Sequence, residues 1–215
     1  EMFFHCLYDC DALPHIMPAL AAQYHQPCSE KPSISGRDYI SQTIQYAIQR
    51  QLPTQALLSL ALQRIVKHSP GNQLPAHDPK QNISTEALDS TLKKLCAPKE
   101  YSDFATAFCL FQRHVRQSKS LKPKAVIDLL QRLDAWRKPE RFQDILAACN
   151  VVDNVMGDSV NEQYSHDIQF LQQCYQQCMT VKAKTFTEQG ISGREVGDAI
   201  HHARLILIAE IKNTN

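Results

Sequence analysis

The stretch "LKPKAVIDLLQRLDAWRKPERFQDILAAC" (residues 121–149) carries the clearest structural signal in the chain. Between Lys124 and Lys138, apolar residues recur at every third or fourth position, which is typical of a helix with one buried face. Pro139 interrupts this series, because proline has no backbone N–H to donate inside a helix. A second apolar series follows it. We therefore predict two helices, over 124–138 and 140–156, and expect Trp136 to lie in the core rather than to stack on a base.

Helical spacing of apolar residues continues through most of the chain. The further helices that it predicts cover 2–13, 38–50, 54–67, 84–96, 100–117, 161–179 and 192–211. We expect Ser84 to cap one of them, and Ser192 with Glu195 to form a capping box at the last. Residues 26–37 and 68–82 are rich in turn-forming residues and are predicted to be loops. Because no stretch alternates convincingly between apolar and polar residues, the predicted fold class is all-α.

The composition is typical of a soluble globular protein, with 43% hydrophobic and 21% charged residues. The formal net charge is +1, so binding to a nucleic acid would have to come from local clusters of basic residues. No apolar run approaches the roughly 20 residues of a membrane span, and no signal-peptide pattern opens the sequence. We therefore expect a cytoplasmic protein with no membrane partner.

The eight cysteines lie mostly inside helical apolar patterns, so we expect reduced thiols that behave as small apolar side chains. Two pairs, Cys6 with Cys10 and Cys174 with Cys178, have a spacing that puts both side chains on one helix face. A structural zinc site needs four ligands, and the sequence offers no evident second pair of ligands for either cysteine pair. The sequence therefore predicts no metal site.

Basic residues are in excess between residues 113 and 141, in a chain that is otherwise nearly neutral. Lysine and arginine side chains bind phosphates and release counterions, so this excess favours contact with a nucleic-acid backbone. The residues that we expect to make this contact are Lys119, Lys122, Lys124, Arg137, Lys138 and Arg141, with Lys182, Lys184 and Arg194 as further candidates near the C-terminal end. The alternative is that Arg137 and Lys138 only complement a helix C-terminus and the others are solvated surface residues.

Residues 121–149 resemble the C-terminal half of the bacterial CCA-adding enzymes, the tRNA nucleotidyltransferases. That family has a helix ending in Asp-Ala-(Trp/Phe)-Arg-(Lys/Arg)-Pro-x-Arg, followed by an apolar helix. Two other stretches agree in the same order. "MFFHCLYDCDALPHIMPAL" (2–20) resembles the family's neck, with Asp11 where glycine is usual, and "TEQGISGREVGDAIHHARL" (187–205) resembles its last helix. Residues 28–110 match the family in helix pattern only.

The resemblance implies a segment made of the end of the neck helices (1–25), a helical body (26–156) and a helical tail (157–215). The family adds nucleotides in an N-terminal head with a Gly-Ser loop and an Asp-x-Asp pair, neither of which is present in this chain, and Glu1 is not preceded by Met. Mg²⁺, CTP and ATP are expected at that head. The segment would then have no catalytic residues and no cofactor of its own, and would hold the tRNA elbow by its phosphate backbone.

In many relatives the body is a metal-dependent phosphohydrolase of the HD type, which needs a His-Asp dyad and a later Asp. The dyad is expected within Leu62-Gln63-Arg64, and the later acid is replaced by Val152, with Asp153 one place away. The resemblance therefore implies a degenerate HD domain without a metal. His77-Asp78 and His166-Asp167 lie elsewhere, so an HD-type phosphohydrolase with displaced ligands, acting on 2′,3′-cyclic phosphate or 2′-nucleotide ends, remains an alternative. A non-catalytic helical interaction domain is another.

Overall fold

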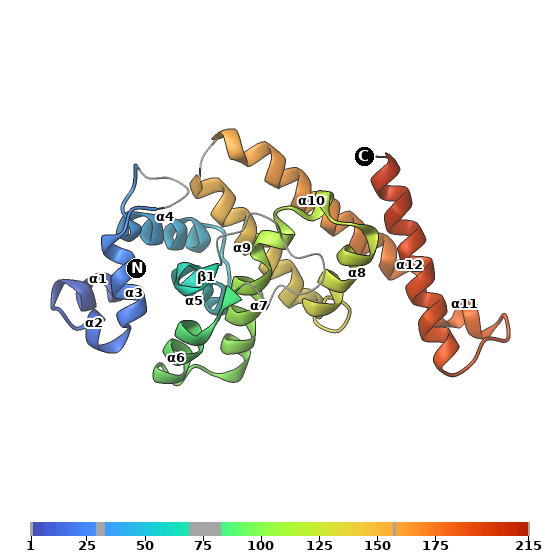
Figure 1. Cartoon of the computed structure of the whole chain (residues 1–215), viewed down its shortest axis with the longest axis horizontal. Helices are drawn as coiled ribbons and strands as arrows, with labels where there is room; N and C mark the ends of the chain where they lie inside the picture. Colours follow the sequence, from blue (N-terminus) through green and yellow to red (C-terminus); the bar gives the residue numbers. More distant parts are fainter. Residues whose placement is uncertain (1, 29–32, 69–82, 157, 215) are drawn as a thin grey trace.

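The computed structural model describes residues 2–28, 33–68, 83–156 and 158–214. Its helices form an elongated array, with α1–α3 at one end and α11–α12 at the other (Figure 1). The predicted all-α fold class is confirmed. The only strands among the described residues are β1 (Lys67–His68) and β2 (Ile83–Ser84), a short antiparallel pair that the sequence analysis missed.

The N-terminal end contains three short helices, α1 (Met2–Asp9), α2 (Leu13–Ile16) and α3 (Pro18–His25). The single helix predicted over 2–13 is therefore wrong. The chain turns at Asp11, whose φ of 56° lies in the left-handed region. Pro14 and Pro18 each lie in the first turn of a helix, where the missing N–H costs no hydrogen bond.

The body is built around α4 (Gly36–Gln49), α5 (Thr54–Leu62) and α7 (Lys99–Val115), with a 3-10 turn η1 (Gln63–Ile65) after α5 and a small helix α6 (Glu86–Lys94) before α7. Helix α5 packs against α4, α7 and α9. The N-cap of α6 is Thr85, so the expected cap at Ser84 is wrong by one residue. Helix α4 begins very close to α3, because a Cβ on Gly36 would stand 1.8 Å from the carbonyl oxygen of Gln23. This close approach fixes α3 beside the body.

Helices α8 (Pro123–Arg132) and α9 (Pro139–Met156) correspond to the stretch quoted first, but α8 is shorter than the predicted helix over 124–138. The chain leaves the helix at Asp134, whose φ is 54°. The N–H of Asp134 donates to Gln131 at 2.9 Å and that of Ala135 to Leu130 at 3.0 Å, the pattern of a Schellman motif. Trp136, Arg137 and Lys138 therefore belong to a tight connection between the two helices.

The C-terminal part contains α10 (Asp158–Thr180), α11 (Ala183–Thr187) and α12 (Arg194–Thr214). Helix α10 packs along α9, and α12 packs against both α10 and α8 (Figure 1). The last helix begins two residues after Ser192, following Gly193 at φ 62°, so the predicted capping box at Ser192 is not formed. One continuous apolar core runs from Leu13 to Ile211.

The eight cysteines are all free thiols, and five of them, Cys28, Cys109, Cys149, Cys174 and Cys178, are buried in or beside this core. Burial raises the pKa of Cys109 to about 12, which makes its thiolate scarce at neutral pH. None of the described helices has the length and apolar character needed to cross a membrane.

Candidate nucleic-acid interface

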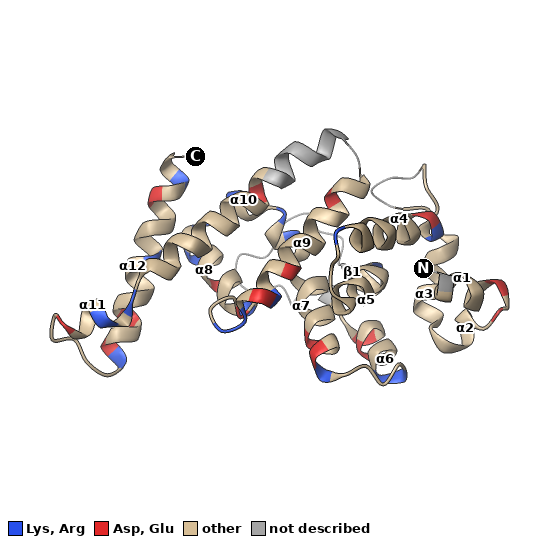
Figure 2. Cartoon of the chain, turned by 180° about the vertical axis from the view of Figure 1, so that it is seen from behind, with Lys and Arg blue, Asp and Glu red and all other residues tan. Residues whose placement is uncertain are grey.

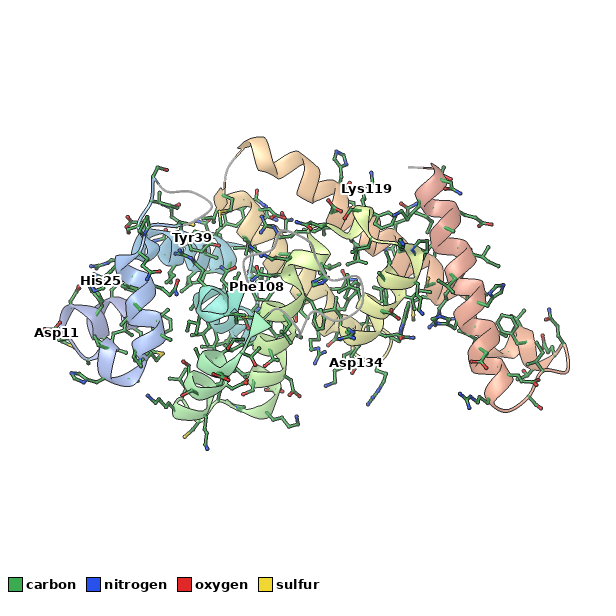
Figure 3. All side chains as sticks on the ribbon, viewed as in Figure 1. Asp11, His25, Tyr39, Phe108, Lys119 and Asp134 are labelled. Carbon is green, nitrogen blue, oxygen red and sulfur yellow. The ribbon has the colours of Figure 1, made fainter. Side chains whose placement is uncertain are left out.

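The six basic residues of the 113–141 stretch that we expect to bind phosphate separate into two groups at opposite ends of α8. Figure 3 shows this directly: Lys119, before the helix begins, and Asp134, after it ends, lie on opposite sides of the body. We call Lys119, Lys122 and Lys124 the helix-start cluster, and Arg137, Lys138 and Arg141 the helix-end cluster. Helix α8 has ten residues, so it holds them apart by about 15 Å. The helix predicted over 124–138 would carry Lys124, Arg137 and Lys138 together, but α8 ends at Arg132, so the structure has two separate clusters.

The helix-start cluster stands on a short turn, η3 (Ser118–Ser120), that α10 holds in place. The carboxylate of Asp167 accepts a hydrogen bond from the backbone N–H of Lys119 at 2.6 Å, and the Ser118 hydroxyl donates to the Asp167 carbonyl at 2.7 Å. Lys212 of α12 donates to the carbonyl of Leu121. Because the backbone is fixed from two sides, the exposed lysine side chains of this cluster start from a rigid base.

The helix-end cluster has two exposed members and one that supports the fold. The side chain of Arg137 is 83% exposed and lies 3.9 Å from Asp134, a weak ion pair, while Lys138 is also exposed. Arg141 is half-buried, and its Nη2 donates to the carbonyl of Leu133 at 3.0 Å. This bond satisfies a carbonyl at the C-terminal end of α8. Arg137 and Lys138 are thus the members best placed to bind a phosphate.

Trp136 lies half-buried between the body and the last two long helices. Its ring stacks on Tyr175 of α10, with centroids 5.7 Å apart, and the guanidinium carbon of Arg204 lies 4.0 Å from the ring centroid. Arg204 in turn donates to the carbonyl of Cys178 at 3.3 Å. An aromatic ring and a guanidinium group of the protein therefore contact the indole, which packs against the core as expected.

A third group, the tail cluster of Lys182, Lys184 and Arg194, lies at the tip formed by α11 and the start of α12 (Figure 2). All three side chains are exposed, and Lys184 lies 3.7 Å from Glu188. Arg194 is the first residue of α12, where the backbone N–H groups of a helix favour an anion. The structure does not bring this cluster next to α8, because the length of α12 separates them (Figure 1).

A cavity of about 650 Å³ opens between α3, α4, η1, α7 and α9. Gln63, Arg64 and Val152 line it, so the positions where the resemblance places an HD dyad and its later acid do converge in space. The charged residues of the lining are Arg64, Arg113 and Arg116, and no carboxylate, imidazole or thiol is among the lining residues that the structure describes. A divalent metal has no anionic ligand on these walls.

The polar groups around this cavity are engaged with one another. Gln63 is buried and its Nε2 donates to the Tyr39 hydroxyl at 3.0 Å, while Arg64 Nη2 donates to the carbonyl of Pro27 at 3.0 Å. Asp153, which is 1% exposed, forms an ion pair with Arg116, with Nε and Oδ1 2.5 Å apart. Burial raises the pKa of Asp153 to about 6, although Arg116 pulls it down. This carboxylate faces an arginine rather than open space.

Of the two His-Asp dipeptides, only His166-Asp167 lies among the described residues, and it is not part of a metal-binding group there. His77-Asp78 lies outside the described residues. His166 is exposed, and the Asp167 carboxylate is bound to the backbone of Lys119. Among the residues that the structure describes, no group of three His, Cys, Asp or Glu side chains is arranged to hold a metal ion.

The sequence analysis missed the arginine-lined cavity. In the sequence, Arg113 and Arg116 fall within the basic stretch 113–141, and Arg64 falls within the tripeptide where the dyad is expected. The available signal was Arg64 at a position where the resemblance places a metal ligand, because an arginine attracts an anion and repels a metal cation.

The comparisons with known proteins agree with the resemblance over nearly the whole chain. The chain is 24% identical to the Multifunctional CCA protein of Pseudomonas syringae pv. syringae, covering 100% of this chain and 53% of that protein. It is 26% identical to the Multifunctional CCA protein of Pseudomonas savastanoi pv. phaseolicola over 95% of this chain, and 29% identical to that of Halorhodospira halophila over 66%. The match falls on the C-terminal half of these proteins, so the chain spans about half the length of the curated relatives it matches. No family model and no solved structure matches the chain.

Proposed function

We propose that this chain is the C-terminal, tRNA-holding part of a CCA-adding tRNA nucleotidyltransferase. The observation that carries the proposal is the similarity to Multifunctional CCA proteins, which runs from one end of the chain to the other. In this role the chain grips the tRNA elbow while an N-terminal head binds Mg²⁺, CTP and ATP and adds C, C and A. The segment itself contributes no catalytic residue, and we propose a cytoplasmic location for the whole enzyme.

The distribution of exposed charge supports backbone recognition. The helix-start and helix-end clusters carry exposed lysine and arginine side chains on fixed backbone, about one α8 length apart. RNA helices are recognised mainly by shape and by contacts to phosphates and riboses, which suits a protein that must accept every tRNA. The packed Trp136 supports the same interpretation, since it leaves no aromatic platform for a base at the helix-end cluster.

We further propose that the body (26–156) derives from an HD domain that has lost its metal, between a neck end (1–25) and a tail (157–215). Its support is the convergence of Gln63, Arg64 and Val152 on one cavity, as an HD ancestry requires. A glutamine, an arginine and a valine cannot replace the imidazole and carboxylate ligands of such a centre. Hydrolysis of 2′,3′-cyclic phosphates at this place is therefore not expected.

The experiment that tests the proposed function measures binding of unmodified tRNA to the purified chain at several salt concentrations. We expect binding that weakens linearly in a plot of log affinity against log salt, because each neutralised phosphate releases counterions. A duplex DNA of similar charge is the control and should bind more weakly, since its grooves and backbone spacing differ. If the chain binds tRNA no better than duplex DNA at 100 mM salt, the proposed tRNA-holding role is wrong.

A further inference from the structure

We infer that the cavity between α3, α4, η1, α7 and α9 is a metal-independent site for a phosphate monoester. Arg64, Arg113 and Arg116 line it and supply the positive charge. Its volume of about 650 Å³ falls within the range of pockets that hold small organic ligands. The inference goes beyond tRNA gripping, because none of these lining residues belongs to the three surface clusters.

The balance of charge on the cavity walls favours a dianion. Arg116 is neutralised by Asp153, which is buried and is not itself a lining residue. No ion pair joins Arg64 or Arg113 to a carboxylate among the residues that the structure describes. Among the described residues, two guanidinium charges therefore have no compensating carboxylate, and a phosphate monoester carries about two negative charges at neutral pH.

The partial charges of the helix ends at the cavity oppose binding of an anion, so binding must depend on the arginine side chains. Helices α3, α7 and α9 end at the cavity, and α6 begins there, with Ala87 of its first turn in the lining. Each C-terminus carries a partial negative charge of about one half and the N-terminus of α6 a similar positive one, so the sum of these ends is negative. These ends alone would repel an anion. The guanidinium groups carry whole charges, and Arg64 already neutralises one carbonyl, that of Pro27. The arginines thus set the sign of the cavity, so loss of one should nearly abolish binding of an anion.

One nitrogen of the Arg64 guanidinium is a hydrogen-bond donor that a ligand could satisfy. Arg64 uses Nη2 for Pro27, but its Nη1 is buried and has no hydrogen-bond partner among the described residues. Buried polar groups are nearly always satisfied, so such a donor calls for an acceptor from a ligand or from water. The planar guanidinium matches phosphate oxygens better than an ammonium does. Gln23, Gln26, Gln63 and Gln112 also line the cavity, and the amide of Gln63 is already bound to the Tyr39 hydroxyl.

The phosphate monoester could belong to a free small molecule or to the end of an RNA. Both ligands present the same dianionic phosphate group to the cavity. Isothermal titration with AMP, with adenosine and with inorganic phosphate, in the presence of EDTA, tests the site. A short RNA with and without a terminal phosphate separates the two sources. We expect AMP and inorganic phosphate to bind without metal and adenosine not to bind.

Two substitutions locate the binding. Arg64→Gln and Arg113→Gln should each weaken AMP binding by at least tenfold, because each removes an uncompensated charge. Arg113 is exposed, so Arg113→Gln keeps the test open even if Arg64→Gln disturbs the fold. The matched control is Arg50→Gln, an exposed arginine at the end of α4 that neither lines the cavity nor belongs to a surface cluster, and this variant should bind AMP as the native protein does. Absence of phosphate binding at millimolar concentration, equal binding by native protein and Arg113→Gln, or binding that requires a divalent metal would each overturn the inference.

Discussion

The guanidinium of Arg204 is stacked on the ring of Trp136, with 4.0 Å between the guanidinium carbon and the ring centroid. A second contact of the indole is Tyr175, whose ring is inclined by 24° to it. Three segments far apart in the sequence, the α8–α9 connection, α10 and α12, therefore meet at one side chain. This stack fastens the C-terminal helices to the body.

Replacing Trp136 by alanine is expected to destabilise the protein. The change removes a large half-buried aromatic side chain and the stacked cation, and we expect a loss of about 3 kcal/mol in the free energy of unfolding. Urea denaturation followed by circular dichroism measures it. Trp136→Phe keeps an aromatic ring next to Tyr175 and Arg204 and should lose less than half as much stability. Unchanged stability combined with weaker tRNA binding would show instead that the indole contacts a base.

The buried pair of Asp153 and Arg116 is expected to make stability depend on pH. The folded-state pKa of Asp153 is raised from 3.8 to about 6, chiefly by burial, so between these values the folded protein binds a proton that the unfolded chain has released. Stability attributable to this group is therefore highest below pH 4 and falls as the pH rises towards 6. Two pKa units correspond to about 3 kcal/mol as an order of magnitude.

The measurement is urea denaturation at intervals between pH 4 and pH 7, for the native protein and for Asp153→Asn. Asparagine cannot ionise, so the difference in stability between the two proteins should change by about 2–3 kcal/mol across this window. Comparing two proteins removes the contribution of every other titrating group. A difference that stays constant with pH would mean that Arg116 keeps Asp153 ionised throughout.

The all-α class and most helix positions are predictable from the sequence, because apolar residues recur with helical spacing over long stretches. The residues at which helices end are harder to predict from the sequence. Asp134 occupies the left-handed position usually given to glycine, and nothing in "QRLDAWRKP" marks α8 as ending before it. Pro14 and Pro18 look like interruptions but begin new helices, because a proline in the first turn is satisfied without its N–H.

The candidate sites, too, are only partly predictable from the sequence. The polar neighbours of the helix-start lysines, Arg137 and Lys138 predict that these side chains are exposed. Their separation into two clusters could not be predicted, because it depends on where α8 ends. The cavity brings together residues from Ala19 to Met156, a convergence that no local pattern encodes. Only the resemblance, which aligned Gln63, Arg64 and Val152 with a metal centre, pointed to that place.

Arg141 and Arg137 are close in the sequence but are expected to respond differently to substitution. Arg141→Ala removes the donor to the Leu133 carbonyl at the end of α8 and should cost about 1–2 kcal/mol of stability. Arg137→Ala removes an exposed side chain with a weak ion pair and should cost less than about 0.5 kcal/mol. Thermal melts of the two variants side by side test this contrast, and equal losses would show that the Leu133 contact contributes nothing.

The exposed pair in the helix-end cluster gives the most direct test of tRNA binding. The double change Arg137→Ala and Lys138→Ala should leave the melting temperature nearly unchanged, because neither side chain supports the core. Phosphate contacts carry no sequence information, so binding should weaken alike for different tRNAs. The plot of log affinity against log salt should flatten by about one to two units, one for each lost phosphate contact.

The matched control is Lys93→Ala with Lys94→Ala, an exposed basic pair at the end of α6, which should retain the native slope. If both double variants keep that slope and a native fold, the "RKP" of the connection only joins two helices, and the tRNA contact must be sought at the helix-start or tail cluster.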